Sequence, residues 1–137
     1  ILESDLIIIT YRLLQEKEQR ACLEKKIKFI KNNNKKFILI GPKDFGYNIN
    51  APLRQKMYNY KATSNHDIES FNLYLKELVS KHNFIDFIGL IGDEDRKIPL
   101  FTSSNKLISY DRAHLTFNGA KDIGELLFKH PLLQELR

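Results

Sequence analysis

The sequence has little cysteine and no long apolar run. Cys22 is the only cysteine among the 137 residues, which excludes an intrachain disulfide and a zinc site built from cysteines. The longest apolar stretches, 6–9, 37–40 and 84–91, fall far below the ~20 residues that a membrane helix needs, and no basic-then-apolar leader is present. We therefore expect a soluble chain. We place Cys22 on the apolar face of a helix, as a small core residue rather than a nucleophile.

The composition is that of a globular protein. Hydrophobic residues make up 42% of the chain and charged residues 28%, which fits one ordinary domain spanning residues 1–137. The net charge of +5 comes largely from lysines at 25–36, in a predicted helix and its exit loop where acidic residues also occur at 16, 18 and 24. A nucleic-acid-binding protein more often has a basic surface on which arginines and aromatic residues are interleaved, so we expect no nucleic-acid partner.

The hydrophobic pattern predicts an α/β fold. Residues 5–10, 37–40 and 84–88 are continuous apolar segments of the kind found in strands covered on both faces. Helical spacing fills the intervals at 13–30 and 67–82. The order strand, helix, strand, helix, strand implies parallel strands joined by right-handed crossovers, and hence a mainly parallel sheet.

A last helix follows residue 116. Thr116 can accept a backbone N–H as the N-cap, apolar residues recur at helical intervals to 128, and Pro131 stops the helix. Short irregular strands at 100–104 and 107–109 are expected to precede it.

The segment 41–62 is a candidate binding loop. It is long and irregular, and it leaves the carboxyl end of a predicted parallel strand, where open α/β sheets bind ligands. Its aromatic rings and guanidinium suit sugars and carboxylated sugars, although for each residue taken singly a loop packed by its own aromatics is the simpler explanation. The residues concerned are Tyr47, Arg54, Tyr58 and Tyr60.

The acidic run 92–96 lacks the alternating ligands of a calcium loop, so we interpret it as a solvated turn. We predict no metal site and no cofactor.

Asp111 and His114 form the one constellation that looks suited to catalysis. They stand three residues apart, after the last predicted parallel strand and directly before the last helix. A histidine needs a partner that fixes its tautomer and stabilises its charged form, and a carboxylate on the same turn can do both. In an α/β order this position falls at the edge where loops from strand ends converge.

The segment from Tyr110 to Ala120, which reads YDRAHLTFNGA, resembles the last conserved block of the SGNH (GDSL-like) hydrolase family. It is most similar to the SGNH domains at the C-terminal end of bacterial membrane acyltransferases that O-acetylate cell-surface polysaccharides. Residues 5–12 and 37–42, with a Gly-Pro turn, are similar to two successive strands of those domains. The resemblance covers most of the chain.

The resemblance implies a three-layer, flavodoxin-like fold and a serine esterase or O-acetyltransferase. His114 would be the general base that takes a proton from a serine hydroxyl, and Asp111 would orient it. The substrate would be an acylated glycan, the partner a membrane acyltransferase domain in the N-terminal remainder of the same protein, and the location the periplasmic or extracytoplasmic face of the inner membrane.

The chain departs from the family in two respects. It has neither the Gly-Asp-Ser block that carries the nucleophile nor the Gly-x-Asn-Asp of the oxyanion hole. We therefore expect the C-terminal portion of an SGNH domain, without its first strand, in which the serine lies outside this chain. Such a portion would leave a sheet edge or an apolar face uncovered.

Two other interpretations stay open. In the first, the chain is a non-catalytic α/β module in which Asp111 hydrogen-bonds backbone amides and the turn only anchors the last helix. The second, a nucleotide-binding flavodoxin-like domain, is weak because no glycine-rich phosphate loop follows any predicted strand.

Overall fold

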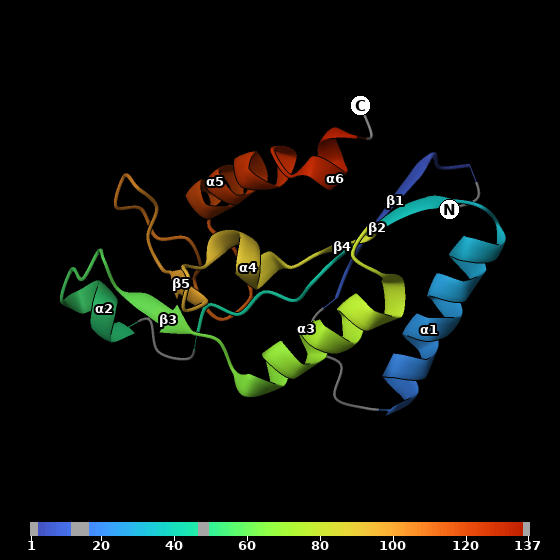
Figure 1. Ribbon diagram of the computed structural model, residues 1–137. Coiled ribbons are helices and arrows are strands. Elements are labelled where there is room, and N and C mark those ends of the chain that lie inside the picture. The colour runs from blue at the N-terminus through green and yellow to red at the C-terminus, as the bar shows by residue number, and fades with distance from the viewer. Residues whose placement is uncertain (1–2, 12–16, 47–49, 136–137) are drawn as a thin grey trace. The chain divides into compact units, whose positions relative to one another are not determined.

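A computed structural model describes residues 3–11, 17–46 and 50–135 (Figure 1). Strands and helices alternate along the chain, and they form two compact units that are described separately below. The first unit comprises Ile1–Pro42 and Asp67–Asp86, and the second comprises Lys43–His66 and Phe87–Arg137.

The first unit contains a three-stranded parallel sheet. Its strands are β1 (Leu6–Thr10), β2 (Lys36–Ile40) and β4 (Phe84–Ile85), in the order β1-β2-β4. Ile8 pairs with Ile38 across β1 and β2, and Leu39 pairs with Phe84 across β2 and β4. The α/β class and the parallel sheet predicted from the hydrophobic pattern are confirmed.

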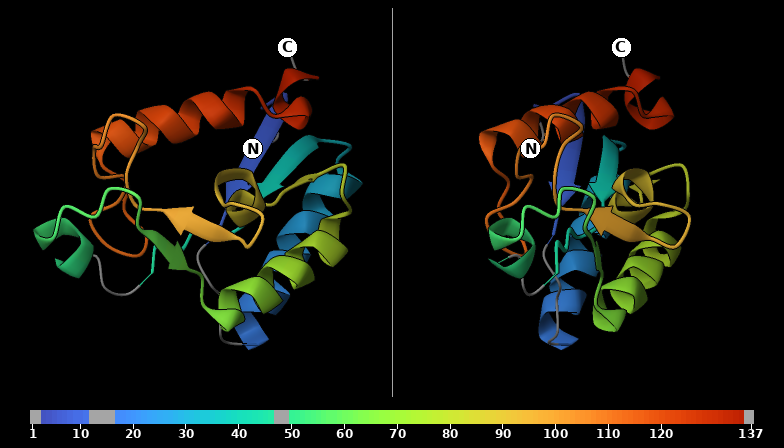
Figure 2. Two further views of the ribbon diagram at one scale, coloured as in Figure 1. Left: turned by 60° about the vertical axis from the view of Figure 1, so that its left-hand side comes forward. Right: turned by 90° about the vertical axis from the view of Figure 1, so that its left-hand side faces the viewer.

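Two helices cover one face of this sheet. Figure 2 shows α1 (Lys17–Asn32) and α3 (His66–Val79) side by side on that face. Apolar residues at helical spacing enter the core together with alternate residues of the strands. The buried set is Leu23, Ile27 and Ile30 of α1, Phe71, Leu75 and Val79 of α3, and Phe37, Leu39 and Phe84 of the strands.

Two sequence predictions are corrected here. Cys22 is exposed rather than buried, because it lies about 100° around the helix from Leu23, which occupies the buried stripe. The predicted strand at 84–88 ends at Ile85, and the helix α4 (Phe87–Ile91) takes its second half. A short apolar run fits a strand and a buried helix equally well, so periodicity could not separate the two. Residues 13–16 of the predicted first helix lie outside the described residues.

One edge of the sheet is open among the described residues. Of the strands that the structure describes, only β2 pairs with β1. The side chain of Ile8 in β1 is 53% exposed, although the strand reads as one that is covered on both faces. The sequence analysis expected an uncovered edge or apolar face on the ground that the first strand of an SGNH domain is missing, and that reason stays a prediction.

The second unit holds a small antiparallel sheet that the sequence did not predict. Its strands are β3 (Lys61–Thr63) and β5 (Lys97–Pro99). A short helix, α2 (Asn50–Arg54), precedes β3, so the segment 41–62 is less irregular than expected. The short strands predicted at 100–109 are reduced to isolated bridges from Phe101 to Leu107 and from Ser109 to Leu115.

The last helices follow the predicted pattern. Helix α5 (Phe117–Phe128) begins at the N-cap Thr116, whose hydroxyl accepts the Gly119 N–H at 3.0 Å. Pro131 does not sit in α5 but opens the next helix, α6 (Pro131–Gln134). Across the described ranges, no helix has the length and apolar character needed to cross a bilayer.

Candidate functional site

The Asp111–His114 turn is the tip of a closed loop. Ser109 bridges to Leu115, and the Tyr110 N–H donates to the His114 carbonyl at 3.0 Å. Ser109 is 1% exposed, and its hydroxyl lies 2.6 Å from the Asp111 carbonyl oxygen and 2.5 Å from that of His114, to which it donates. The hydroxyl of Ser109 therefore holds the loop together and is not presented as a nucleophile.

The Asp111 carboxylate folds the turn back on itself. One oxygen, Oδ1, accepts the backbone N–H groups of Ala113 at 2.7 Å and of His114 at 2.8 Å. The other, Oδ2, lies 2.8 Å from Nδ1 of His114. The spacing of three residues is what allows one carboxylate to bind both the backbone and the ring.

These contacts keep Asp111 ionised. The Ala113 N–H, the His114 ring and the His114 N–H hold the pKa of the Asp111 carboxyl far below its usual range. A carboxylate beside Nδ1 favours the tautomer that carries its proton there, which leaves Nε2 as a lone-pair acceptor. The contact with Asp111 thus occupies Nδ1 of His114 and leaves Nε2 outside it.

Nε2 of His114 is open to solvent. The side chain of His114 is 80% exposed and that of Asp111 is 53% exposed. Within the described ranges, the only hydrogen bond to the ring is the one at Nδ1. A hydroxyl group brought from elsewhere could reach Nε2 without displacing a protein partner.

Arg112, which lies between Asp111 and His114 in the sequence, forms an ion pair with a buried carboxylate, that of Asp44. Its Nε donates to Oδ1 of Asp44 at 2.9 Å and its Nη2 to Oδ2 at 2.8 Å, which is a bidentate ion pair. The side chain of Asp44 is 2% exposed and that of Arg112 is 33% exposed. The Phe45 N–H also donates to the Arg112 carbonyl at 3.0 Å. Two contacts thus fasten the Asp111–His114 turn to the segment at 44–45.

Asp44 stays charged despite its burial. Desolvation raises the pKa of its carboxyl, but hydrogen bonds from the Arg112 guanidinium and from the N–H groups of Asn65 and Gly46 outweigh desolvation and leave that pKa below its ordinary value. The sequence analysis missed Asp44. The available signal was its place two residues after the Gly-Pro turn, at the start of the segment singled out as a candidate loop.

Of the four residues suggested as sugar contacts, the structure describes three. Tyr58 and Tyr60 are 41% and 37% exposed, and Tyr58 packs edge-on against Phe101 with the ring centroids 5.3 Å apart. Arg54 ends α2 and is exposed. Tyr47 lies outside the described residues.

The acidic run at 92–96 forms the predicted turn. The Arg96 N–H donates to the Asp93 carbonyl at 2.8 Å, and the Asp93 carboxylate accepts the Lys97 N–H at 2.8 Å and the Lys61 ammonium at 2.9 Å. In the part of the chain that the structure describes, no three His, Cys, Asp or Glu residues gather as metal ligands would.

Similarity to known proteins adds nothing to this geometry. No protein-family model, no curated protein and no solved structure matches the chain. The resemblance to SGNH hydrolases rests on the residues around Asp111 and His114 and stays a prediction.

Proposed function

We propose that this chain supplies the Asp–His half of a serine esterase or O-acetyltransferase that acts on acyl groups of cell-surface glycans. The observation that carries the proposal is the 2.8 Å contact between Oδ2 of Asp111 and Nδ1 of His114, with the opposite ring nitrogen exposed. On this proposal the serine lies outside the 137 residues, because none of their serines stands in a Gly-Asp-Ser block. The parent protein would work at the extracytoplasmic face of the inner membrane, with a membrane acyltransferase domain as its partner.

The proposed reaction uses His114 twice. Nε2 takes the proton from the serine hydroxyl as the serine oxygen bonds to the acyl carbonyl carbon. The imidazolium then returns that proton to the departing alcohol oxygen, and a water or an acceptor hydroxyl later removes the acyl group by the same steps. Asp111 stabilises the imidazolium. General acid–base catalysis of this kind accelerates a reaction by about 10²–10⁴-fold.

The test is the release of acetate from p-nitrophenyl acetate and from an acetylated polysaccharide by the full-length protein that contains these residues. His114→Ala should lower the rate by about 10²–10⁴, and added imidazole should restore part of it. Asp111→Asn should also lower the rate, because the amide N–H would face Nδ1 and favour the wrong tautomer. The amide oxygen can still accept from Ala113 and His114, so the turn should survive.

His82→Ala is the matched control, since His82 is exposed and lies in the first unit. The control should keep the wild-type rate. Wild-type rates in both His114→Ala and Asp111→Asn would end the catalytic assignment.

A second candidate function follows from the other oxygen of Asp111. Oδ1 accepts two backbone N–H groups, which is what a purely structural turn before α5 would need. On this interpretation the module is non-catalytic. His114→Ala would then leave both acetate release and stability unchanged, whereas Asp111→Ala would lower stability alone.

A further inference from the structure

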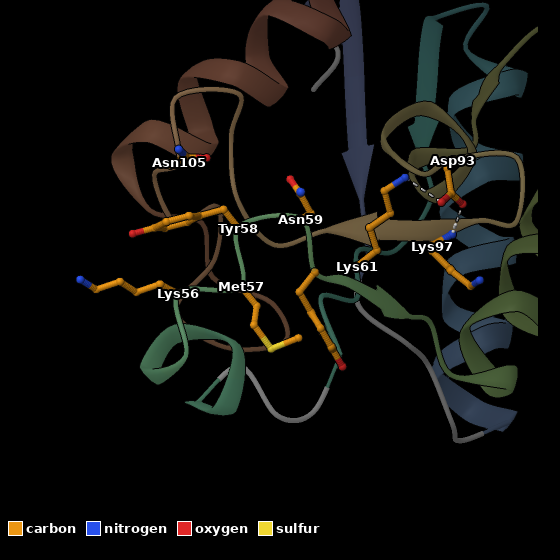
Figure 3. Close-up of a pocket in the computed structure, with 9 residues that line it drawn as sticks. Lys56, Met57, Tyr58, Asn59, Lys61, Asp93, Lys97 and Asn105 are labelled. Atoms are coloured by element: carbon orange, nitrogen blue, oxygen red, sulfur yellow. Dashed lines mark hydrogen bonds and ion pairs between the residues drawn. The ribbon is translucent and has the colours of Figure 1, made fainter.

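A wide hollow in the second unit is lined by residues that suit a sugar chain. It has a volume of about 980 Å³, at the upper end of the range for small-molecule sites. We call it the Tyr58 groove. The residues that line it are Lys56, Met57, Tyr58, Asn59, Tyr60, Lys61, Asp93, Lys97 and Asn105 (Figure 3).

A second hollow lies against the same Tyr58–Tyr60 segment. A neighbouring cavity of about 340 Å³ shares Tyr58, Asn59, Tyr60, Lys61 and Asn105 with the groove. Two adjoining hollows that share one wall offer room for more than one ring. Together the two hollows offer more room than a single sugar ring fills, so the ligand that we consider is an oligosaccharide.

One methionine and two tyrosine side chains offer apolar surfaces beside polar groups. Met57, Tyr58 and Tyr60 are between 37% and 42% exposed, and the amides of Asn59 and Asn105 line the same hollow. An aromatic face packs on the apolar C–H face of a sugar ring, while amides pair with its hydroxyls.

The charge of the groove is positive but partly compensated. Three lysines, Lys56, Lys61 and Lys97, line it against one carboxylate, Asp93. Figure 3 shows Asp93 bound by the Lys61 ammonium and by the Lys97 backbone N–H, at 2.9 and 2.8 Å. Lys97 also pairs with Asp95 at 3.1 Å. A surface with this charge attracts a ligand whose carboxylates are widely spaced. A protein that binds a polyphosphate chain needs a denser basic surface whose lysines and arginines are not paired with acids.

The groove is built on a loop with fixed geometry. The Met57 N–H donates to the Pro52 carbonyl and the Tyr60 N–H to the Met57 carbonyl, both at 2.9 Å. Lys56 has a φ of 52°, a left-handed conformation that is uncommon for lysine and that occurs often at ligand sites. A loop that is ordered before binding loses less entropy when the ligand arrives.

We infer that the Tyr58 groove binds an acidic oligosaccharide, with sugar rings against Tyr58 and Tyr60 and carboxylates near Lys56. That this glycan is also the substrate rests on the proposed function. The groove thereby specifies the substrate class as carboxylated sugar chains.

The experiment is an NMR titration of the ¹⁵N-labelled chain with trigalacturonic acid. The highest concentration is about 10 mM, which is ten times the Kd of a site with millimolar affinity. Backbone signals of Asn59, Lys61 and Asn105 should shift. Maltotriose, which has no carboxylate, should bind about tenfold more weakly, a difference of ~1.4 kcal/mol. Raising the ionic strength to about 1 M, where the Debye length is ~3 Å, should weaken the response.

Variants assign the contacts. Tyr58→Ala and Lys56→Glu should each weaken binding about tenfold, whereas Tyr58→Phe, which keeps the ring, should bind as wild type. Lys28→Glu is the matched control on an exposed lysine of α1 and should leave binding unchanged. No shift with trigalacturonic acid, an equal response to maltotriose, or tighter binding of a trithymidylate would overturn the inference.

Different results are expected if the groove does not bind the oligosaccharide and if the Asp111–His114 pair (the dyad) is not catalytic. p-Nitrophenyl acetate carries no sugar, so its hydrolysis tests the Asp111–His114 pair without requiring the groove, and the control Lys28→Glu should leave it unchanged. Loss of hydrolysis in His114→Ala without any oligouronate binding would refute the groove alone. Binding without an effect of His114→Ala would refute the dyad alone.

Discussion

At the scale of single residues, the Asp111–His114 turn has an exposed side and a side that contacts a buried carboxylate. Asp111 and His114 are more than half exposed and contact each other, whereas Arg112 between them reaches the buried Asp44. The exposed pair supplies the proposed chemistry, and the buried pair fixes the loop that carries it. Asp44 and Arg112 are therefore positioning residues.

Removing Arg112 should destabilise the protein. Arg112→Ala leaves the buried Asp44 carboxylate with the N–H groups of Gly46 and Asn65 as its remaining partners among the described residues, and breaking a buried pair in this way costs about 3 kcal/mol. The free energy of unfolding, from urea denaturation, measures the change. Arg54→Ala, at an exposed arginine of α2, should change it by less than ~0.5 kcal/mol. Equal losses in the two variants would contradict the role given to Arg112.

Asp44 should also make stability fall in acid. Its pKa is lower in the folded protein than in the unfolded chain, so its contribution is complete above the ordinary Asp pKa of about 3.9 and is lost as the pH falls through the lower folded-state value. In Asp44→Asn this contribution is absent. The slope of unfolding free energy against pH, measured from about pH 5 downward, should therefore be shallower by up to ~1.4 kcal/mol per pH unit.

The control for this slope is Asp95→Asn, because the Asp95 side chain is 74% exposed. Its slope should match that of the wild type. An unchanged slope in Asp44→Asn would show that the Asp44 carboxylate is not stabilised by folding.

At the scale of elements, the start of α5 fixes the end of the site loop. Thr116 accepts the Gly119 N–H, and its own hydroxyl donates to the Leu107 carbonyl at 2.5 Å. Gly119 lies against the backbone of Ile108, where any Cβ would overlap the carbonyl oxygen. The Thr and Gly of the YDRAHLTFNGA segment are thus explained by how α5 joins the preceding chain.

Thr116→Ala should lower stability by about 1–2 kcal/mol, since it removes an N-cap and leaves the Gly119 N–H without that acceptor. Thermal unfolding followed by circular dichroism measures the effect. Ser103→Ala, at an exposed hydroxyl, should shift the midpoint little. A Thr116→Ala protein as stable as wild type would mean that the cap is dispensable.

At the scale of the whole molecule, the stability of the first unit depends on its sheet and two helices. Leu75 of α3 is fully buried in the core, whereas Leu73 on the same helix is 62% exposed. Leu75→Ala should cost about 2–5 kcal/mol, and Leu73→Ala should cost less than ~1 kcal/mol. Urea denaturation gives both values. Similar losses at the two positions would refute the packing of α3.

Strands, helices and the Asp–His pair were the predictable part of this protein. The β1 and β2 segments, the stripe Leu23–Ile27–Ile30 and the Thr116 cap depend on local pattern, and local pattern is visible in sequence. The helix α4 was misread because a five-residue apolar run has no period of its own. The catalytic role of Asp111 and His114 stays a prediction.

By itself, the sequence determined the α/β class, the parallel strands and a carboxylate three residues before a histidine, because each depends on residues that are neighbours along the chain. Only the tertiary structure decided that Asp44 pairs with Arg112, and that Lys61 of β3 and Asp93 enclose one wall of a groove. These contacts join residues 68 and 32 positions apart. No local pattern encodes them, since they form only when the chain has brought distant segments together.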